Sequence, residues 1–521
     1  FSAQGYRFYQ SSYDEDLEGS WLSVNYDPWG TGITYTGFCL MGLGCLLLLC
    51  ARDGGFRRLL RHPLIRKGGL FLIALFWGCQ LKADPALPVV KRVQADSLAI
   101  QQVVYNDRVA PFNTLARDFV QKIYGRPSFH GITPEQVVSS WMLYPEEWNR
   151  TPIIRIKNQE LRTALGLKEE YASLNHLFDG TQYKLQPLWQ REQGNRSKLA
   201  QAIQETDEKV GLILMLRQGT LVRPLPPDVT HLSTQKVNAE LWYNRIPFSK
   251  ILFMVNLTLG FAAFGLFMFR MLTGRKEKAV SRRVWGTALC LTTLFHATGY
   301  ALRGYIRGGF PLSNGYETMQ FVALAVLLTA CLLQRRFPFT RPFGFLLSGF
   351  TLLVAYLGEM NPQITPLMPV LASPWLSWHV SLIMISYGLF AFTFLNGILA
   401  LCLIGKQKNT ASPVTGEQIE QLTLLSRLLL YPGTFLLGIG IVLGAVWANV
   451  SWGSYWSWDP KEVWALAAFI IYGISFHRNS LPCFQRPWVF HGYMVFAFAV
   501  VLMTYFGVNY LLGGMHSYAN S

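Results

Sequence analysis

Five of the sixteen tryptophans in this 521-residue chain lie within eighteen residues. They are Trp447, Trp452, Trp456, Trp458 and Trp464. Asp459, followed by Pro460 and Glu462, has the pattern of a capping box, which predicts that a helix begins there. The free N–H groups of such a helix start attract anions. A broad, flat aromatic surface beside them predicts a platform for a large planar ligand, and the alternative interpretation is an interfacial aromatic belt.

Histidine is the second residue type that could do chemistry beside these tryptophans. His379 opens one apolar run and His516 follows the last one, both on the side of the predicted membrane where the tryptophans lie. Imidazole is a common axial ligand of haem iron, and a six-coordinate iron takes a ligand from each side. The two histidines flanking an aromatic surface therefore predict a haem site, although each alone also fits a capping or interfacial role.

Three more histidines fall within or at the ends of apolar runs. Ionisable residues inside a bilayer are candidates for function. His477 ends the run that starts in the tryptophan segment, at the opposite face, which would suit a first docking point for a ligand that later reaches the outer site. For His296 we expect a packing role, and the role of His491 stays open.

The composition shows what kind of chain must position these residues. Hydrophobic residues make up 51% of it and charged residues only 15%, against roughly a quarter charged in average globular chains. This excludes a disordered protein, a disulfide miniprotein and an ordinary soluble enzyme. We expect an all-α polytopic membrane protein with about ten transmembrane helices. The apolar runs are 33–50, 68–81, 251–272, 284–306, 318–333, 343–357, 376–404, 429–447, 463–477 and 488–512.

The cations that give the chain its net charge of +16 are concentrated in alternate loops between the predicted spans. Every second loop is basic, as in 51–67 and 270–283, and bilayers keep Lys and Arg on the cytoplasmic side. The cations therefore indicate cytoplasmic loops and argue against nucleic-acid binding. The outer face then carries the polar insert 83–247 and the loops 307–317, 358–375 and 448–462.

The chain divides into four expected parts. Residues 1–50 hold the first span, and 51–82 form a basic cytoplasmic loop with the second span. Residues 83–247 form an extracytoplasmic soluble domain of mixed or mostly helical structure, in which Thr133-Pro134-Glu135-Gln136 predicts a helix start. Residues 248–521 form the main membrane domain, with the tryptophan loop at 447–464.

These residues resemble a known family, the haem-handling proteins of cytochrome c biogenesis, specifically the CcsA/ResC type of system II. The segment 447–464 is similar to the tryptophan-rich WWD signature, and 311–317 and 506–518 are also similar to that family. Residues 2–50 resemble the C-terminal end of the partner protein CcsB/ResB. The whole resembles a CcsB–CcsA fusion that lacks its N-terminal part.

The resemblance implies a cytochrome c synthase with haem-export activity in the plasma (inner) membrane. Such proteins receive haem b at the cytoplasmic side, hold it at the outer WWD site and attach it to the CxxCH thiols of apocytochrome c. Carried onto this chain, His379 and His516 would be the outer axial ligands and His477 one ligand of a site within the membrane. The family's other intramembrane histidine lies in early spans of the partner.

The outer loops contain no nucleophile–base pair of the usual catalytic kind, so the catalytic residues stay unassigned. We expect the WWD loop to act by positioning the haem edge and the peptide thiols. The expected partners are apocytochrome c, haem, the lipid bilayer and the CcsB/ResB N-terminal part or subunit, without nucleic acid. The alternative functions are a membrane b-type cytochrome that passes electrons outward and a haem-binding or docking subunit without synthase activity.

Overall fold

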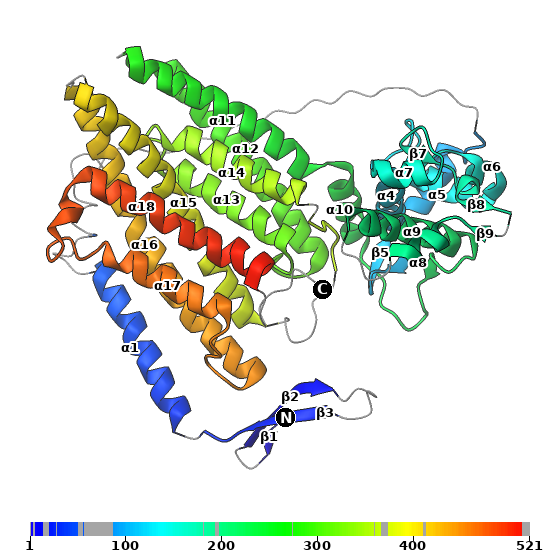
Figure 1. The fold of residues 1–521 in the computed structure, drawn as a ribbon, viewed down its shortest axis with the longest axis horizontal. Coiled ribbons are helices and arrows are strands. Elements are labelled where there is room, and N and C mark those ends of the chain that lie inside the picture. The colour runs from blue at the N-terminus through cyan, green and yellow to red at the C-terminus, as the bar shows by residue number, and fades with distance from the viewer. Residues whose placement is uncertain are drawn as a thin grey trace.

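The computed structural model describes most of the chain. The described residues are 2–3, 6–13, 20–27, 29–50, 56, 87–180, 182–192, 197–273, 275–358, 360–365, 373–409 and 413–512. Figure 1 shows a bundle of long helices, a unit of short helices and strands at one end of it, and an N-terminal sheet followed by a single helix.

The N-terminal strands form a three-stranded antiparallel sheet in the order β1-β2-β3. Their bounds are Ser2–Ala3, Tyr6–Tyr13 and Ser20–Asn25. Helix α1 (Gly30–Cys50) follows directly. The side chain of Asp27 stabilises the start of this helix, because its Oδ1 accepts the backbone N–H of Gly30 at 2.7 Å and thereby satisfies a free helical donor.

The polar insert folds around a hydrophobic core of its own. Trp141 and Trp148 are fully buried there, and their ring centroids lie 5.8 Å apart. The predicted capping box at Thr133 and Gln136 is confirmed at the start of α5. The elements are α3 (Arg92–Ala99), β4 (Gln102–Tyr105), β5 (Arg108–Pro111), α4 (Phe112–Tyr124), α5 (Pro134–Leu143), α6 (Pro145–Arg150), β6 (Ile154–Arg155), α7 (Gln159–Ala164), β7 (Tyr171–Ala172), η1 (Asn175–Leu177), β8 (Phe178–Asp179), β9 (Gln182–Tyr183), α8 (Leu185–Glu192), α9 (Lys198–Arg217), β10 (Arg223–Pro224) and α10 (Thr234–Arg245).

The bundle confirms a polytopic all-α membrane protein. Each predicted span that falls within the described residues corresponds to a helix, whereas 68–81 lies outside them. Seven of the described helices are long and apolar enough to cross a membrane. The helices of two further predicted spans are not among them, because α17 has only 15 residues and α12, although 29 residues long, is too polar. The bundle elements are α11 (Phe248–Thr273), α12 (Ala279–Arg307), α13 (Gly315–Leu333), α14 (Thr340–Leu357), α15 (Pro374–Asn409), α16 (Pro413–Trp452), α17 (Pro460–Ile474), η3 (Pro482–Gln485), α18 (Pro487–Leu502) and η4 (Met503–Leu512), the last a π-helix.

Helices α15 and α16 pack closely along their length because glycines on α16 let the backbones approach. A Cβ on Gly440 would lie 2.6 Å from Cδ1 of Ile383, and a Cβ on Gly433 would lie 2.8 Å from the ring of Phe390. Phe390 in turn stacks on Tyr472 of α17 with a centroid distance of 3.6 Å. Small residues at such contacts are the usual basis of helix packing in membranes.

The insert contacts the bundle at the loop 358–375, which the pattern of loop charges predicts to lie on the same side of the membrane as the insert. Nε of Arg108 donates to the carbonyl of Ile364 at 2.9 Å, and Nδ2 of Asn106 donates to Oε1 of Gln363 at 3.2 Å. Helix α10 also packs against α12. The insert therefore lies at the end of the bundle that carries the loop between α14 and α15 (Figure 1).

Candidate functional site

The non-helical part of the tryptophan segment is shorter than the sequence predicted. The expected loop began at residue 448, but α16 continues to Trp452 because residues 448–452 contain neither glycine nor proline. Gly453 has a φ of +80°, a left-handed conformation that ends helices and favours glycine. The irregular segment is therefore confined to residues 453–459.

The predicted capping box at the start of α17 is confirmed. Oδ1 of Asp459 accepts the backbone N–H of Lys461 at 2.9 Å, and Oε2 of Glu462 accepts that of Asp459 at 3.2 Å. Oε2 of Glu462 also accepts the backbone N–H of Ser457 at 2.8 Å. Both carboxylates thus hold the segment in place, as their capping role predicted.

The tryptophan rings do not form the flat surface that we expected. Trp447 is buried and meets Trp452 at 66° with centroids 4.7 Å apart, because both belong to the end of α16. Trp456 and Trp458 lie almost perpendicular, at 89° and 6.0 Å. Trp458 is 74% exposed and has a φ of +59°, which is strained for a bulky residue. The rings form walls of different orientation rather than one plane.

His379 lies against α16 directly next to this segment. Its Nδ1 donates to the carbonyl oxygen of Gly440 at 2.6 Å. A Cβ on Gly444 would lie 2.6 Å from Cε1 of His379, so the imidazole occupies the space that this glycine leaves. Gly440, Gly444 and Trp447 follow one another along one face of α16, since residues three and four apart lie on the same face. The histidine ring therefore sits about one helical turn from Trp447.

The other expected outer ligand, His516, lies outside the described residues. The segment leading toward it is tied to α17, because Oγ1 of Thr504 in η4 donates to the carbonyl oxygen of Trp464 at 3.3 Å. π-helical segments are rare, and those that occur are often found at functional sites. Trp464 packs partly buried between α17 and its neighbours.

The N-terminal sheet contacts the tryptophan segment, which the sequence did not predict. The hydroxyl of Tyr9 donates to the carbonyl oxygen of Asn449 at 3.2 Å, and Nδ2 of Asn25 donates to that of Gly453. The Tyr9 ring lies where a Cβ on Gly453 would be. From α1, Tyr35 approaches Tyr455 edge-on at 6.0 Å. Gly453, a residue without a side chain within the tryptophan segment, was the one feature of the sequence that could have indicated this close contact.

The three remaining candidate histidines lie apart from the tryptophan segment. His477 is exposed just past the end of α17. His296 is buried on α12, and its Nε2 donates to Oε1 of Gln320 at 3.1 Å. His491 is buried on α18 with its Nε2 2.9 Å from the Thr423 hydroxyl. Buried side-chain hydrogen bonds of this kind fit structural roles for His296 and His491.

A buried ion-pair network anchors the helices at the end of the bundle that carries the insert. Nε of Arg303 donates to Oε1 of Glu317 at 2.7 Å, and both side chains are 1% exposed. The Arg303 guanidinium also donates to the carbonyl oxygens of Pro362 and Gln363 at 2.7 and 3.0 Å. Because residues 362 and 363 belong to the connection between α14 and α15, this network holds the segment that leads into the helix of His379. Glu317 is thereby a structural anchor.

The insert approaches the connection between α14 and α15 through Asp118, a carboxyl group that is a weaker acid than usual. Burial raises the pKa of Asp118 on α4 to about 6, and Arg117 and Arg108 oppose that rise. Its hydrogen-bond partners are Tyr105 and Gln363. A carboxyl group with a pKa of about 6 therefore lies at the contact between the insert and residue 363.

Together the fold and the site define a polytopic membrane protein with a tryptophan-rich segment and a helix-borne histidine at one end of the bundle. Residues 312–516 match the family model of the cytochrome C assembly protein. That range includes His379 and the whole tryptophan segment.

Comparison with individual proteins extends this match over the chain. It is 32% identical to Protein NrfI of Wolinella succinogenes across 99% of its own length and 66% of that protein. The cytochrome c biogenesis protein CcsA of Synechococcus sp. (strain CC9902) is 32% identical over 50% of this chain and 95% of its own. CcsA of Guillardia theta is 34% identical over 44% of this chain and 82% of its own. The chain belongs to the CcsA family of cytochrome c biogenesis proteins.

Proposed function

We propose that this protein carries haem across the membrane and attaches it covalently to apocytochrome c. The haem, as haem b, is held at the outer WWD site between His379 and His516, and His477 contributes one ligand to a site within the membrane. The activity is that of a system II cytochrome c synthase of the plasma (inner) membrane. The partners are apocytochrome c with its CxxCH motif and a CcsB/ResB part.

The geometry of His379 is the observation that carries this proposal. Donation from Nδ1 to the carbonyl of Gly440 fixes the tautomer in which Nε2 bears the lone pair. Ligating histidines usually donate their other ring nitrogen in this way, which orients the ring and raises its basicity. The contact with Gly444 restricts the ring further. A ring so oriented about one turn from Trp447 suits a haem iron at the edge of the tryptophan segment.

The tryptophan segment supplies the position of the haem rather than a reacting group. In the attachment, each cysteine thiol adds across a haem vinyl group: the S–H bond breaks, a C–S bond forms, and the hydrogen goes to the neighbouring carbon. This addition needs no oxidant or reductant. Because Asp459 and Glu462 hold residues 457–461 through backbone N–H groups, the Trp456 and Trp458 side chains are presented from a constrained backbone. Such positioning is how proximity lowers a barrier.

We also propose that residues 1–50, 51–82, 83–247 and 248–521 are the functional parts of the protein. The insert and the WWD loop then face outward, where apocytochrome c is met. The contact of Asn106 and Arg108 with residues 363 and 364 supports a role of the insert in guiding the apocytochrome toward the helix of His379. The placement of the insert beside this loop agrees with the alternating loop charges.

The test is to co-express the full chain with a CxxCH reporter peptide and measure covalently bound haem together with the absorption spectrum of the purified protein. His379→Ala should abolish the low-spin spectrum and lower haem attachment by at least tenfold. The matched control is His231→Ala, which removes an exposed histidine of the insert and should leave both unchanged.

Three outcomes would contradict the proposal. Unchanged attachment in His379→Ala would exclude this histidine from the site. Stoichiometric haem that is retained without transfer to the reporter would indicate a membrane b-type cytochrome. Haem transfer that needs a separate synthase would reduce the protein to a docking subunit.

A further inference from the structure

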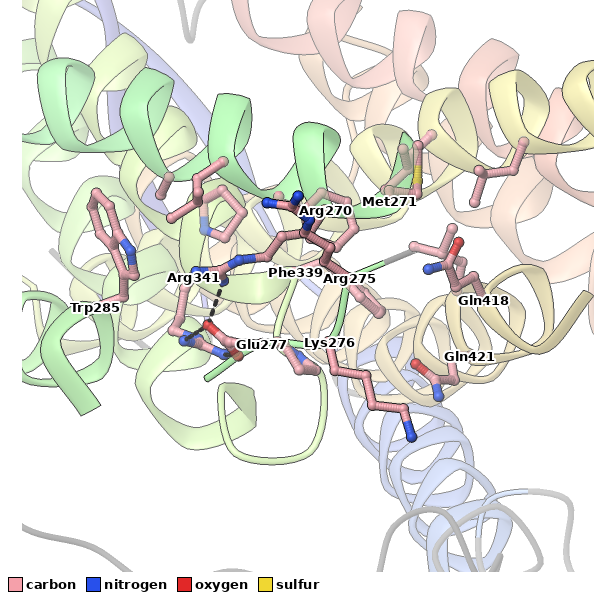
Figure 2. Close-up of a pocket in the computed structure, with 18 residues that line it drawn as sticks. Arg270, Met271, Arg275, Lys276, Glu277, Trp285, Phe339, Arg341, Gln418 and Gln421 are labelled. Carbon is pink, nitrogen blue, oxygen red and sulfur yellow. Dashed lines mark hydrogen bonds and ion pairs between the residues drawn. The ribbon is translucent and has the colours of Figure 1, made fainter. Parts of the chain in front are cut away.

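A cavity lies at the other end of the bundle, far along the helices from the tryptophan segment. It has a volume of about 290 Å³ and is bounded by α11, α12, α14, α15 and α16 (Figure 2). Its walls are mostly apolar, and the side chains that form them include Leu266, Phe267, Phe339, Leu399, Leu403 and Leu422. Ligand pockets in proteins begin at about this size.

One side of the cavity is strongly basic. Arg270, Arg275, Lys276 and Arg341 line it together with a single acid, Glu277. Figure 2 shows these residues grouped between Trp285 on one side and Gln418 and Gln421 on the other. The four cations and one anion leave an excess of three positive charges beside an apolar space.

The buried part of this cluster is built around Arg341. Its side chain is 2% exposed, and its Nη1 and Nη2 donate to the two oxygens of Glu277 at 3.0 and 2.8 Å. Arg270 also donates to Glu277, at 3.1 Å. The Nε of Arg341 is buried and has no hydrogen-bond partner among the described residues. Since an unpaired buried donor costs free energy, this arginine favours a further acceptor.

Arg275 and Lys276 complete the cluster at the surface. Both are exposed, and no ion pair joins either of them to an acid within the described residues. The single carboxylate of Glu277 is already shared by two guanidinium groups. An anion that enters from the surface would therefore meet two cations without competition from a protein carboxylate.

The chemistry of the lining selects an amphiphile with an anionic head. Apolar walls accept a hydrocarbon chain, and the arginine cluster accepts phosphate oxygens, for which guanidinium groups are well suited. Haem also has an apolar body and anionic groups, but its iron needs an axial ligand. The lining contains no histidine or cysteine, and its one methionine, Met271, would stand alone. The lining therefore fits a lipid better than haem.

We propose that this cavity binds the phosphate head of an anionic phospholipid, with the first part of an acyl chain along the apolar walls. A volume of about 290 Å³ takes only part of such a molecule. The rest of the acyl chains would lie along the bundle surface, where Phe261 and Phe269 of α11 are about half exposed. By the distribution of loop charges this end faces the cytoplasm, whose leaflet holds anionic lipids that basic pockets between helices recognise. The site is independent of the proposed haem chemistry.

The test measures lipid retained by the purified full chain. Native mass spectrometry with stepwise addition of phosphatidylglycerol or phosphatidylcholine should show preferential binding of the anionic lipid. The double variant Arg275→Gln/Lys276→Gln should weaken phosphatidylglycerol binding about fivefold for each cation removed, thus roughly 25-fold in all. The matched control, Arg478→Gln/Arg486→Gln, removes two exposed cations from another loop of the same face and should keep the wild-type affinity.

Two further arms distinguish the source of the bound anion. Inorganic phosphate at millimolar concentration should not displace phosphatidylglycerol, because it lacks the apolar part; full displacement would indicate a site for a free anion and overturn the lipid assignment. Haem that displaces the lipid in the wild type but not in the double variant would assign the cavity to haem instead. Equal lipid preference in the double variant and the control would show that the cavity does not bind the head group.

Discussion

The close contact between His379 and Gly444 makes this glycine the sharpest probe of the proposed haem site. A Cβ on Gly444 would lie 2.6 Å from Cε1 and 2.7 Å from Nδ1 of the imidazole. Ordinary contacts start near 3.4 Å, so Gly444→Ala must push the ring by about 0.8 Å. The same shift disturbs the 2.6 Å hydrogen bond from Nδ1 to the carbonyl of Gly440.

The expected effect on haem attachment is larger than the effect on folding. Alanine in place of glycine within a helix gains about 1 kcal/mol, whereas overpacking costs about 1–3 kcal/mol. The free energy of unfolding should therefore fall by no more than about 2 kcal/mol. A displacement near 1 Å at a reacting geometry costs about 100-fold in rate. We expect Gly444→Ala to fold and to lower covalent haem attachment by about two orders of magnitude.

The assay is the CxxCH reporter co-expressed with the full chain, scored by covalent haem and by the low-spin spectrum of the purified protein. Gly265→Ala on α11 is the matched control, because no atom outside its own helix lies within 4 Å of the added Cβ. It should keep wild-type attachment. Normal attachment and spectrum in Gly444→Ala would refute the reasoning that the position of His379 against α16 sets the haem site.

Two further predictions concern the end of the bundle that carries the insert. Arg303→Met removes one of the two arginines that pair with the buried Glu317, which keeps its ion pair with Arg307, and it also takes the donors from the carbonyl oxygens of Pro362 and Gln363. We therefore expect a loss of about 1–3 kcal/mol and a lower thermal unfolding midpoint in detergent. Arg92→Gln, which removes an exposed helical pair with Asp96, should change stability by less than about 1 kcal/mol, and equal midpoints of the two variants would contradict this prediction. Asp118 has a folded-state pKa of about 6, above its ordinary value of 3.8, so between these values the folded state binds more protons than the unfolded state and stability rises as the pH falls from 6 to 4, by at most about 3 kcal/mol. Midpoints measured from pH 4 to 8 should show this slope in the wild type and lose it in Asp118→Asn, and a slope that survives the substitution would place its origin elsewhere.

Much of the fold could be predicted because membranes impose strong local rules. Apolar runs must form helices that satisfy their own backbone, which is why every predicted span within the described residues is helical. The start of α17 was predictable from Asp459, Pro460 and Glu462, since capping depends on neighbours three residues apart. The family was likewise evident from contiguous residues, above all the segment 447–464.

Features that depend on residues distant in sequence could not be predicted in this way. The close approach of Gly444 to His379 joins two helices, and the contact of Tyr9 with Gly453 joins residues more than four hundred positions apart. The end of α16 was misplaced because no breaker marks residue 448 and the helix continues until the left-handed turn at Gly453. The basic loop at 270–283 was visible as charge in the sequence, but only packing places Arg270 and Arg341 on one carboxylate beside a cavity. Local sequence determines which segments become helices and where they start, whereas side-chain packing between helices decides which chemical groups meet.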